Sequence, residues 1–165
     1  MPELVLVAGV AETGVIGDGE TILWHYDADE RQYKERVAGH PVVVGRKTWA
    51  GMTDVRGTHP VVVTRSPGEY DAQNATFVST VPDAVEAVAD HDSVGYVIGG
   101  QHVYSMFLPY ADRAFVSELP EQATGSRVFP YLGTAWTVAG RERFEAFDVV
   151  EYHHEEPRPV ADAAE

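Results

Sequence analysis

The chain has 165 residues, which suits one domain with a single hydrophobic core. No apolar run approaches the roughly 18–20 residues that a membrane span needs. The first residues lack the basic and apolar regions of a secretory signal, and the absence of cysteine removes disulfide frameworks and thiolate metal sites. A cytoplasmic protein is therefore expected.

Charge is the unusual feature of the composition. Against 12 basic residues there are 26 acidic ones, so that the formal net charge is −14. A surface this negative repels phosphate backbones, and we expect no nucleic-acid partner. The same charge repels itself within a compact domain, and salt screens that repulsion. The charge indicates a halophilic host with concentrated salt in its cytoplasm, with an ordinary acidic protein as the alternative.

The N-terminal part predicts one strand and one helix. Residues 3–10 are a β-branched apolar run typical of a buried strand. A loop follows, with glycines at three places: Gly14, Gly17 and Gly19. Asp27 fits a helix N-cap, with Glu30 as its capping-box partner, and Gly39 just beyond Ala38 predicts the end of that helix.

The central part alternates short strands and helices. Strands are predicted over residues 41–44, 60–65 and 76–78, and a short helix over residues 46–52. Pro82 suits the first turn of a helix that runs to about residue 91.

The C-terminal part predicts a strand over residues 94–98, a helix over 101–108 and a strand over 113–119. Residues 136–144 and 147–153 resemble a closing antiparallel pair. Strands that alternate with helices predict a mostly parallel α/β sheet, to which this pair adds an antiparallel edge. We expect one domain over residues 1–155 and a frayed acidic tail over residues 156–165.

Three predicted strands end where a phosphate could bind. Gly45 is followed by Arg46, Lys47 and Thr48, an arrangement of cations that a bound polyanion would explain. Gly99 and Gly100 would let a ligand approach the main chain closely. Taken singly, each could instead be a plain structural turn, and the dinucleotide-binding fingerprint GxGxxG is absent.

The third of these strand ends carries Thr64, Arg65 and Ser66. The guanidinium there could fork onto a phosphate, and an ordinary surface turn is the alternative.

A carboxylate beside aromatic residues is the main candidate for acid–base chemistry. Asp29 falls in the first turn of the predicted helix, Tyr33 follows one turn later on the same face, and Trp24 lies just upstream. An exposed acid that only supports the helix dipole is the alternative. The histidines show no metal-ligand spacing, so no metal site is predicted.

Taken in order, these segments resemble dihydrofolate reductase over residues 3–153. The matching stretches are residues 15–17, Trp24 with Asp29 and Tyr33, residues 41–49, 61–66, 97–104 and 107–109, and Phe129-Pro130. The resemblance implies a single domain with a central eight-stranded, mostly parallel sheet flanked by helices. It implies hydride transfer from NADPH to C6 of dihydrofolate, with Asp29 binding the pterin and promoting protonation of N5. It implies that Trp24 helps to hold an ordered water near that carboxylate.

The resemblance also implies the binding residues. Those for NADPH are Gly9, Ile16, Ile22, Gly45, Arg46, Lys47, Thr48, Thr64, Arg65, Gly99, Gly100, Gln101, Val103 and Tyr104. Those for the substrate are Asp29, Tyr33, Met52, Ile98 and Ser117. A monomer whose one partner is the small-molecule substrate is expected.

Some positions depart from the family pattern. Leu23 and Asp27 stand where prolines are common, and Ser126-Arg127 where an acid and a hydroxyl commonly support the mobile loop. Thr58 stands where an arginine for the folate α-carboxylate is expected, with Arg56 two residues earlier.

Two other interpretations remain open from the sequence. The related pyrimidinone reductase of riboflavin synthesis shares the fold and the cofactor, and the missing arginine at Thr58 is compatible with it. A non-catalytic nucleotide-binding module is the other, and Asp29 argues against it.

Overall fold

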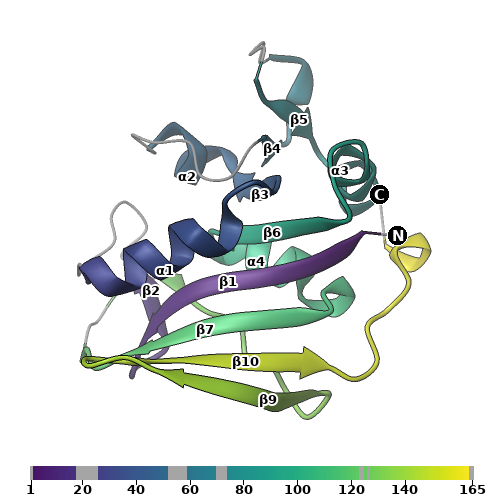
Figure 1. Cartoon of the computed structure of the whole chain (residues 1–165). Helices are drawn as coiled ribbons and strands as arrows, with labels where there is room; N and C mark the ends of the chain where they lie inside the picture. Colours follow the sequence, from purple (N-terminus) through teal and green to yellow (C-terminus); the bar gives the residue numbers. More distant parts are fainter. Residues whose placement is uncertain are drawn as a thin grey trace.

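A computed structural model of the chain describes residues 2–17, 26–51, 59–69, 74–122, 125 and 127–163. An eight-stranded sheet forms its centre, in the order β5-β4-β3-β6-β1-β7-β10-β9 (Figure 1). The strands in that order are Thr76–Val78, Pro60–Val63, Val42–Gly45, Val94–Gly99, Glu3–Ala11, Arg113–Leu119, Asp148–His154 and Trp136–Arg143. Neighbours from β5 to β7 pair in parallel, whereas β10 pairs antiparallel with both β7 and β9. The predicted mostly parallel sheet with an antiparallel C-terminal edge is confirmed.

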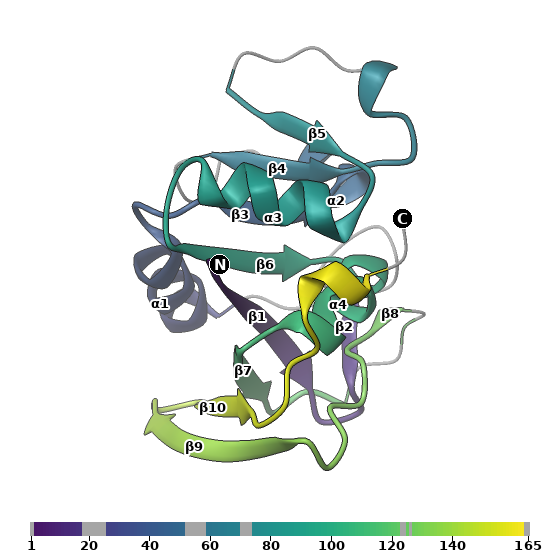
Figure 2. The ribbon, with the colours of Figure 1, turned by 90° about the vertical axis from the view of Figure 1, so that its right-hand side faces the viewer.

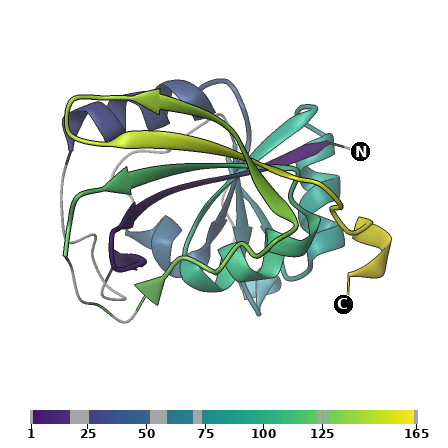
Figure 3. The same cartoon turned by 90° about the horizontal axis from the view of Figure 1, so that it is seen from below.

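Helices cover both faces of the sheet. Helix α1 (Asp27–Val37) lies on one face, and α3 (Val81–Ala89) and α4 (Gln101–Phe107) lie on the other (Figures 2 and 3). The short helix α2 (Arg46–Ala50) follows β3 directly, and single 3₁₀ turns occupy Pro67–Glu69, Leu108–Tyr110 and Val160–Asp162. None of the helices in the described ranges is long and apolar enough to cross a bilayer.

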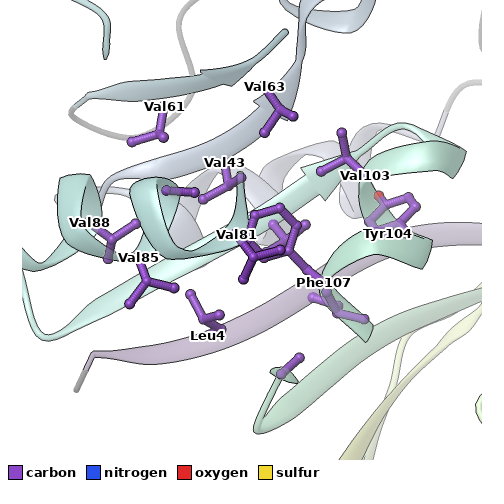
Figure 4. Packing of buried hydrophobic residues seen from close by; sticks show 14 of the residues in the cluster. Leu4, Val43, Val61, Val63, Val81, Val85, Val88, Val103, Tyr104 and Phe107 are labelled. Carbon is purple, nitrogen blue, oxygen red and sulfur yellow. The ribbon is translucent and has the colours of Figure 1, made fainter. Parts of the chain in front are cut away.

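Successive side chains of β1 point to opposite faces of the sheet and contribute to two different hydrophobic cores. Leu4 and Leu6 point to the side of α3 and α4, where they pack with valines of the neighbouring strands and with Phe107 (Figure 4). Val5 and Val7 point to the opposite side, where Val37 closes the core under α1. Since both faces of β1 are buried, its run of apolar residues is explained.

The pairing of β1 and β6 stops before either strand ends. Their pairing ends at Leu6 and Val97, whereas β1 stays paired with β7 as far as Ala11 and Leu119. The chain moves outward from β1 to β3, β4 and β5 before returning to β6, which makes β1 and β6 a topological switch point. Ligands of open α/β sheets bind at the carboxyl ends of the strands at such a point.

The start of α1 differs from the sequence prediction. Asp27 is the first helical residue, and Tyr26 occupies the N-cap with extended backbone and no side-chain cap. The carboxylate of Glu30 instead pairs with Lys34, one turn later, at 3.0 Å. The predicted capping box is therefore wrong, because Asp27 already has helical backbone and cannot fold back onto the next turn.

A second, two-stranded sheet lies where the sequence predicted only a loop. Strand β2 (Val15–Gly17) pairs antiparallel with β8 (Arg127–Val128), and the Phe129 nitrogen donates to the Gly14 oxygen at 2.9 Å. Strands this short show no alternation of apolar and polar residues, and their pairing partners lie far apart in the chain. Local patterns therefore could not reveal them.

The segment that the sequence predicted as a frayed tail contacts the domain as far as residue 163. The Arg158 nitrogen donates to the Pro109 oxygen at 2.8 Å, and Val160 and Ala163 pack against the core under α3. Two small apolar side chains are enough to hold the segment, although prolines and acids dominate its composition.

Candidate active site

Asp29 lies over two residues that face each other on adjacent strands. Gly9 of β1 and Ser117 of β7 are register partners. The Ser117 hydroxyl donates to Asp29 Oδ1 at 2.5 Å, and a Cβ on Gly9 would lie 3.1 Å from Asp29 Oδ2. The serine thus supplies a donor and the glycine supplies space, and both hold the carboxylate at the carboxyl end of the sheet.

Gln32 is a member of this cluster that the sequence analysis missed. Its side-chain amide donates to Asp29 Oδ1 at 2.9 Å and lies 3.3 Å from the Ser117 hydroxyl. Residues three apart share a helix face, so the position of Asp29 on a helix could have identified it.

Aromatic and aliphatic side chains line the same region. Tyr33 and Ile98 pack against the core that lies under α1, and Tyr104 is buried at the end of the β1–β6 pairing. The Tyr104 hydroxyl lies 2.7 Å from the Val7 oxygen and 3.0 Å from the Ile98 oxygen, where it replaces the interrupted strand pairing. Burial raises the pKa of Tyr104 well above its ordinary value, and the nearby Tyr33 and Asp29 act in the same direction.

The turns after β3 and β6 approach each other closely. A Cβ on Gly45 would lie 3.2 Å from Val103 and 3.7 Å from the Gly100 nitrogen, and one on Gly100 would lie 3.4 Å from the Thr48 hydroxyl. Gly99 has a φ of 127°, a conformation that residues with a Cβ rarely adopt, and the Gly99–Gly100 peptide bond is cis. The two turns predicted as phosphate sites therefore form one continuous surface of main chain.

Cations extend this surface toward β4. Gly45 and Val63 are register partners, so Arg46 and Arg65 follow two adjacent parallel strands. Arg46 is half-buried, whereas Lys47 and Arg65 are exposed. The Thr64 hydroxyl accepts a hydrogen bond from the Ser66 nitrogen at 3.3 Å, which fixes the turn in which Arg65 lies.

The remaining predicted residues are placed as follows. Ile16 packs against the core from β2, and the Gln101 side chain accepts a hydrogen bond from the Val128 nitrogen of β8 at 2.9 Å. Ile22, Trp24 and Met52 lie outside the described residues, as do Arg56 and Thr58. Within the described ranges, no group of three or more histidine and acidic side chains could hold a metal ion.

Comparison with known proteins identifies the family. The model for dihydrofolate reductase matches residues 3–156. Dihydrofolate reductase 1 of Haloarcula marismortui is 41% identical, over 97% of this chain and 96% of the relative. The chain belongs to the dihydrofolate reductase family. Of the three interpretations left open by the sequence, these matches favour the first.

Other family members agree with this assignment. Dihydrofolate reductase HdrB of Haloferax volcanii is 34% identical over 98% of this chain and 88% of its own length. The solved dihydrofolate reductase of Enterococcus faecalis, in complex with NADP(H) and RAB-propyl, superposes with a TM-score of 0.83 at 23% identity. That superposition covers 93% of this chain and 97% of the other, and it supports the fold. The Haloarcula relative comes from a halophile, in keeping with the acidic composition.

Proposed function

We propose that the protein reduces 7,8-dihydrofolate to 5,6,7,8-tetrahydrofolate with NADPH, and that Asp29 binds the pterin and promotes protonation of N5. The family assignment makes the protein a dihydrofolate reductase, an oxidoreductase with a small-molecule substrate. The role of each residue is our proposal.

The observation that carries the proposal is the orientation of the Asp29 carboxylate. A carboxylate offers about four acceptor positions, two on each oxygen. Among the described residues, Ser117 and Gln32 both bond to Oδ1. The two positions on Oδ2 are left for a ligand, and the 2-amino and N3 groups of a pterin are two such donors. Tyr33 and Ile98, which pack against the core under α1, would supply apolar surface for the pterin ring.

The joined glycine turns fit a dinucleotide. Side chains at Gly45 and Gly100 would fill the space between β3 and β6, so the missing side chains leave main-chain nitrogens accessible. NADPH, when bound, supplies the hydride. The Thr48 and Thr64 hydroxyls and the Arg46, Lys47 and Arg65 side chains would hold its phosphates. Gly9, Ile16, Gly99, Gln101, Val103 and Tyr104 would shape the nicotinamide end, together with Ile22, which lies outside the described residues.

Three finer statements belong to this proposal. We infer that the protein acts as a monomer, binds no nucleic acid and works in the cytoplasm. The net charge of −14 supports the first two statements, because it opposes self-association and phosphate backbones alike. The support for the third is the absence of cysteine from the sequence, which is in keeping with a reducing compartment.

Activity with Asp29→Asn tests the proposed role. The wild type should oxidise NADPH only when dihydrofolate is present. We expect the variant to lose about 10²- to 10⁴-fold in kcat at neutral and high pH, where protonation needs assistance, and less at low pH, where solvent supplies the proton. NADPH binding, followed by fluorescence, should stay unchanged.

Asp83→Asn is the matched control, since Asp83 is an exposed acid in the first turn of α3. It should leave turnover as in the wild type. Near wild-type turnover of Asp29→Asn at neutral pH would remove Asp29 from the mechanism.

A further inference from the structure

The hydrogen bonds around Asp29 continue beyond the residues that would touch the substrate. Gln32 donates from one end of its side-chain amide to Asp29 Oδ1 at 2.9 Å. At the other end, its oxygen accepts from Nε and Nη2 of Arg36, at 3.3 and 3.1 Å. Asp29, Gln32 and Arg36 therefore form a chain of hydrogen bonds along one face of α1.

Arg36 determines which way the Gln32 amide points. A guanidinium has only donors, and a carboxylate has only acceptors. With the amide reversed, its NH₂ group would face the donors of Arg36 and its oxygen would face Asp29. Both contacts would then be repulsive, so only the observed orientation satisfies the two neighbours.

Arg36 is itself held on two sides. Its guanidinium carbon lies 3.9 Å from the centroid of the Phe115 ring, and Nη2 lies 3.8 Å from Glu142 of β9. Burial lowers the pKa of Arg36 from its ordinary value, and Glu142 opposes that change. The ring and the acid limit the rotamers of a side chain that is otherwise long and flexible.

We infer that Gln32 is a positioning residue for the reaction, with Arg36 fixing its orientation. This inference rests on the role proposed for Asp29. By filling the second acceptor position on Oδ1, the amide prevents rotation of the carboxylate and directs Oδ2 toward the space above Gly9. Among the described residues, Tyr104 of α4 is close enough to this carboxylate for the Asp29 charge to raise the tyrosine pKa, in the same direction as its burial and the nearby Tyr33.

Substitution of Gln32 by leucine removes both hydrogen bonds while keeping similar volume. We expect kcat/KM for dihydrofolate to fall about ten- to a hundredfold, as is typical when a hydrogen bond to a charged group is lost. NADPH affinity, measured by fluorescence, should not change.

A double-mutant cycle separates positioning from simple damage. If Gln32 acts through Asp29, adding Gln32→Leu to the Asp29→Asn background should reduce activity no further. An equal fold loss in both backgrounds would overturn the inference. Glu35→Gln, at an exposed position on the same helix, is the control and should behave as the wild type.

Arg36 gives a second test should Gln32→Leu fail to fold, as judged by thermal melting. Arg36→Met leaves the amide free to reverse, and we expect a smaller loss in kcat/KM, which should again be absent in the Asp29→Asn background. Arg36→Lys keeps a donor and should lose less than Arg36→Met. Equal activity of both variants and the wild type would overturn the role of Arg36. Absence of dihydrofolate reduction by the wild type would overturn the proposed function instead.

Discussion

One buried polar group compensates for the end of the β1–β6 pairing. The Tyr104 hydroxyl occupies the place where the β1–β6 pairing stops and donates its one hydrogen to the Val7 oxygen at 2.7 Å, with the Ile98 oxygen 3.0 Å away. A buried carbonyl without a donor costs about 1–3 kcal/mol. The hydroxyl therefore allows two strands to separate inside the core at little cost in stability.

Tyr104→Phe tests this role. We expect the free energy of unfolding, measured in urea, to fall by about 1–3 kcal/mol, because the Val7 oxygen loses its donor. Tyr131→Phe removes a hydroxyl from a side chain that is 88% exposed and should change stability by less than about 0.5 kcal/mol. Equal stability of Tyr104→Phe and the wild type would show that water or another group replaces the hydroxyl.

The site residues differ in how far the sequence alone predicts them. Asp29 and Ser117 come from the resemblance, and the structure brings them into contact at 2.5 Å. Gln32 bonds to both, yet only the orientation of α1 on the sheet reveals this. Spacing along a helix predicts which residues share one face of that helix. It does not predict which groups of the sheet that face contacts.

At the level of secondary structure, α3 shows how a helix is fitted to the sheet. The Thr80 hydroxyl accepts from the Asp83 nitrogen at 3.1 Å and begins the helix, with Pro82 in its first turn. Val88 then lies directly on β6 at Gly95, where a Cβ would lie 2.7 Å from the valine Cγ1. Close packing of this helix against β6 depends on Gly95 having no side chain.

Gly95→Ala should therefore weaken the packing of α3. Both methyl groups of Val88 lie within 2.8 Å of the added carbon, and a branched side chain cannot turn away from it. We expect a loss of about 1–3 kcal/mol in the free energy of unfolding, measured in urea. Gly140→Ala, on the edge strand β9 with open space around it, is the control and should be close to neutral. Comparable stability of the two variants would contradict the packing argument.

For the whole molecule, net charge is the dominant property. Three arginines form ion pairs between elements. Arg36 of α1 pairs with an acid of β9, Arg113 of β7 pairs with acids of β1 and β10, and Arg141 of β9 pairs with acids of β7 and β10. Even so, 26 acidic residues face 12 basic ones, so most acids repel one another. That repulsion is smaller in the expanded unfolded chain and opposes folding at low salt.

Thermal melting across a KCl series tests this balance. We expect the midpoint to rise between about 0.1 M and about 1 M KCl, where the Debye length falls from about 10 Å to about 3 Å. Sorbitol at matched osmolality should not reproduce the early part of that rise, because it screens no charge. A melting midpoint that stays flat or falls as KCl rises would contradict the interpretation that the acidic composition suits a cytoplasm with concentrated salt.

The sequence by itself determined the order of strands and helices, because apolar periodicity and glycine or proline punctuation are local properties. It also supplied Asp29 and the glycine turns, since their motifs are continuous in the chain. The tertiary structure alone decided the β2–β8 sheet, the docking of the tail and the Asp29–Gln32–Arg36 chain. Each of these depends on groups that meet only when α1 and the distant loops pack onto the sheet, and the energy of such contacts leaves no periodic trace in the sequence.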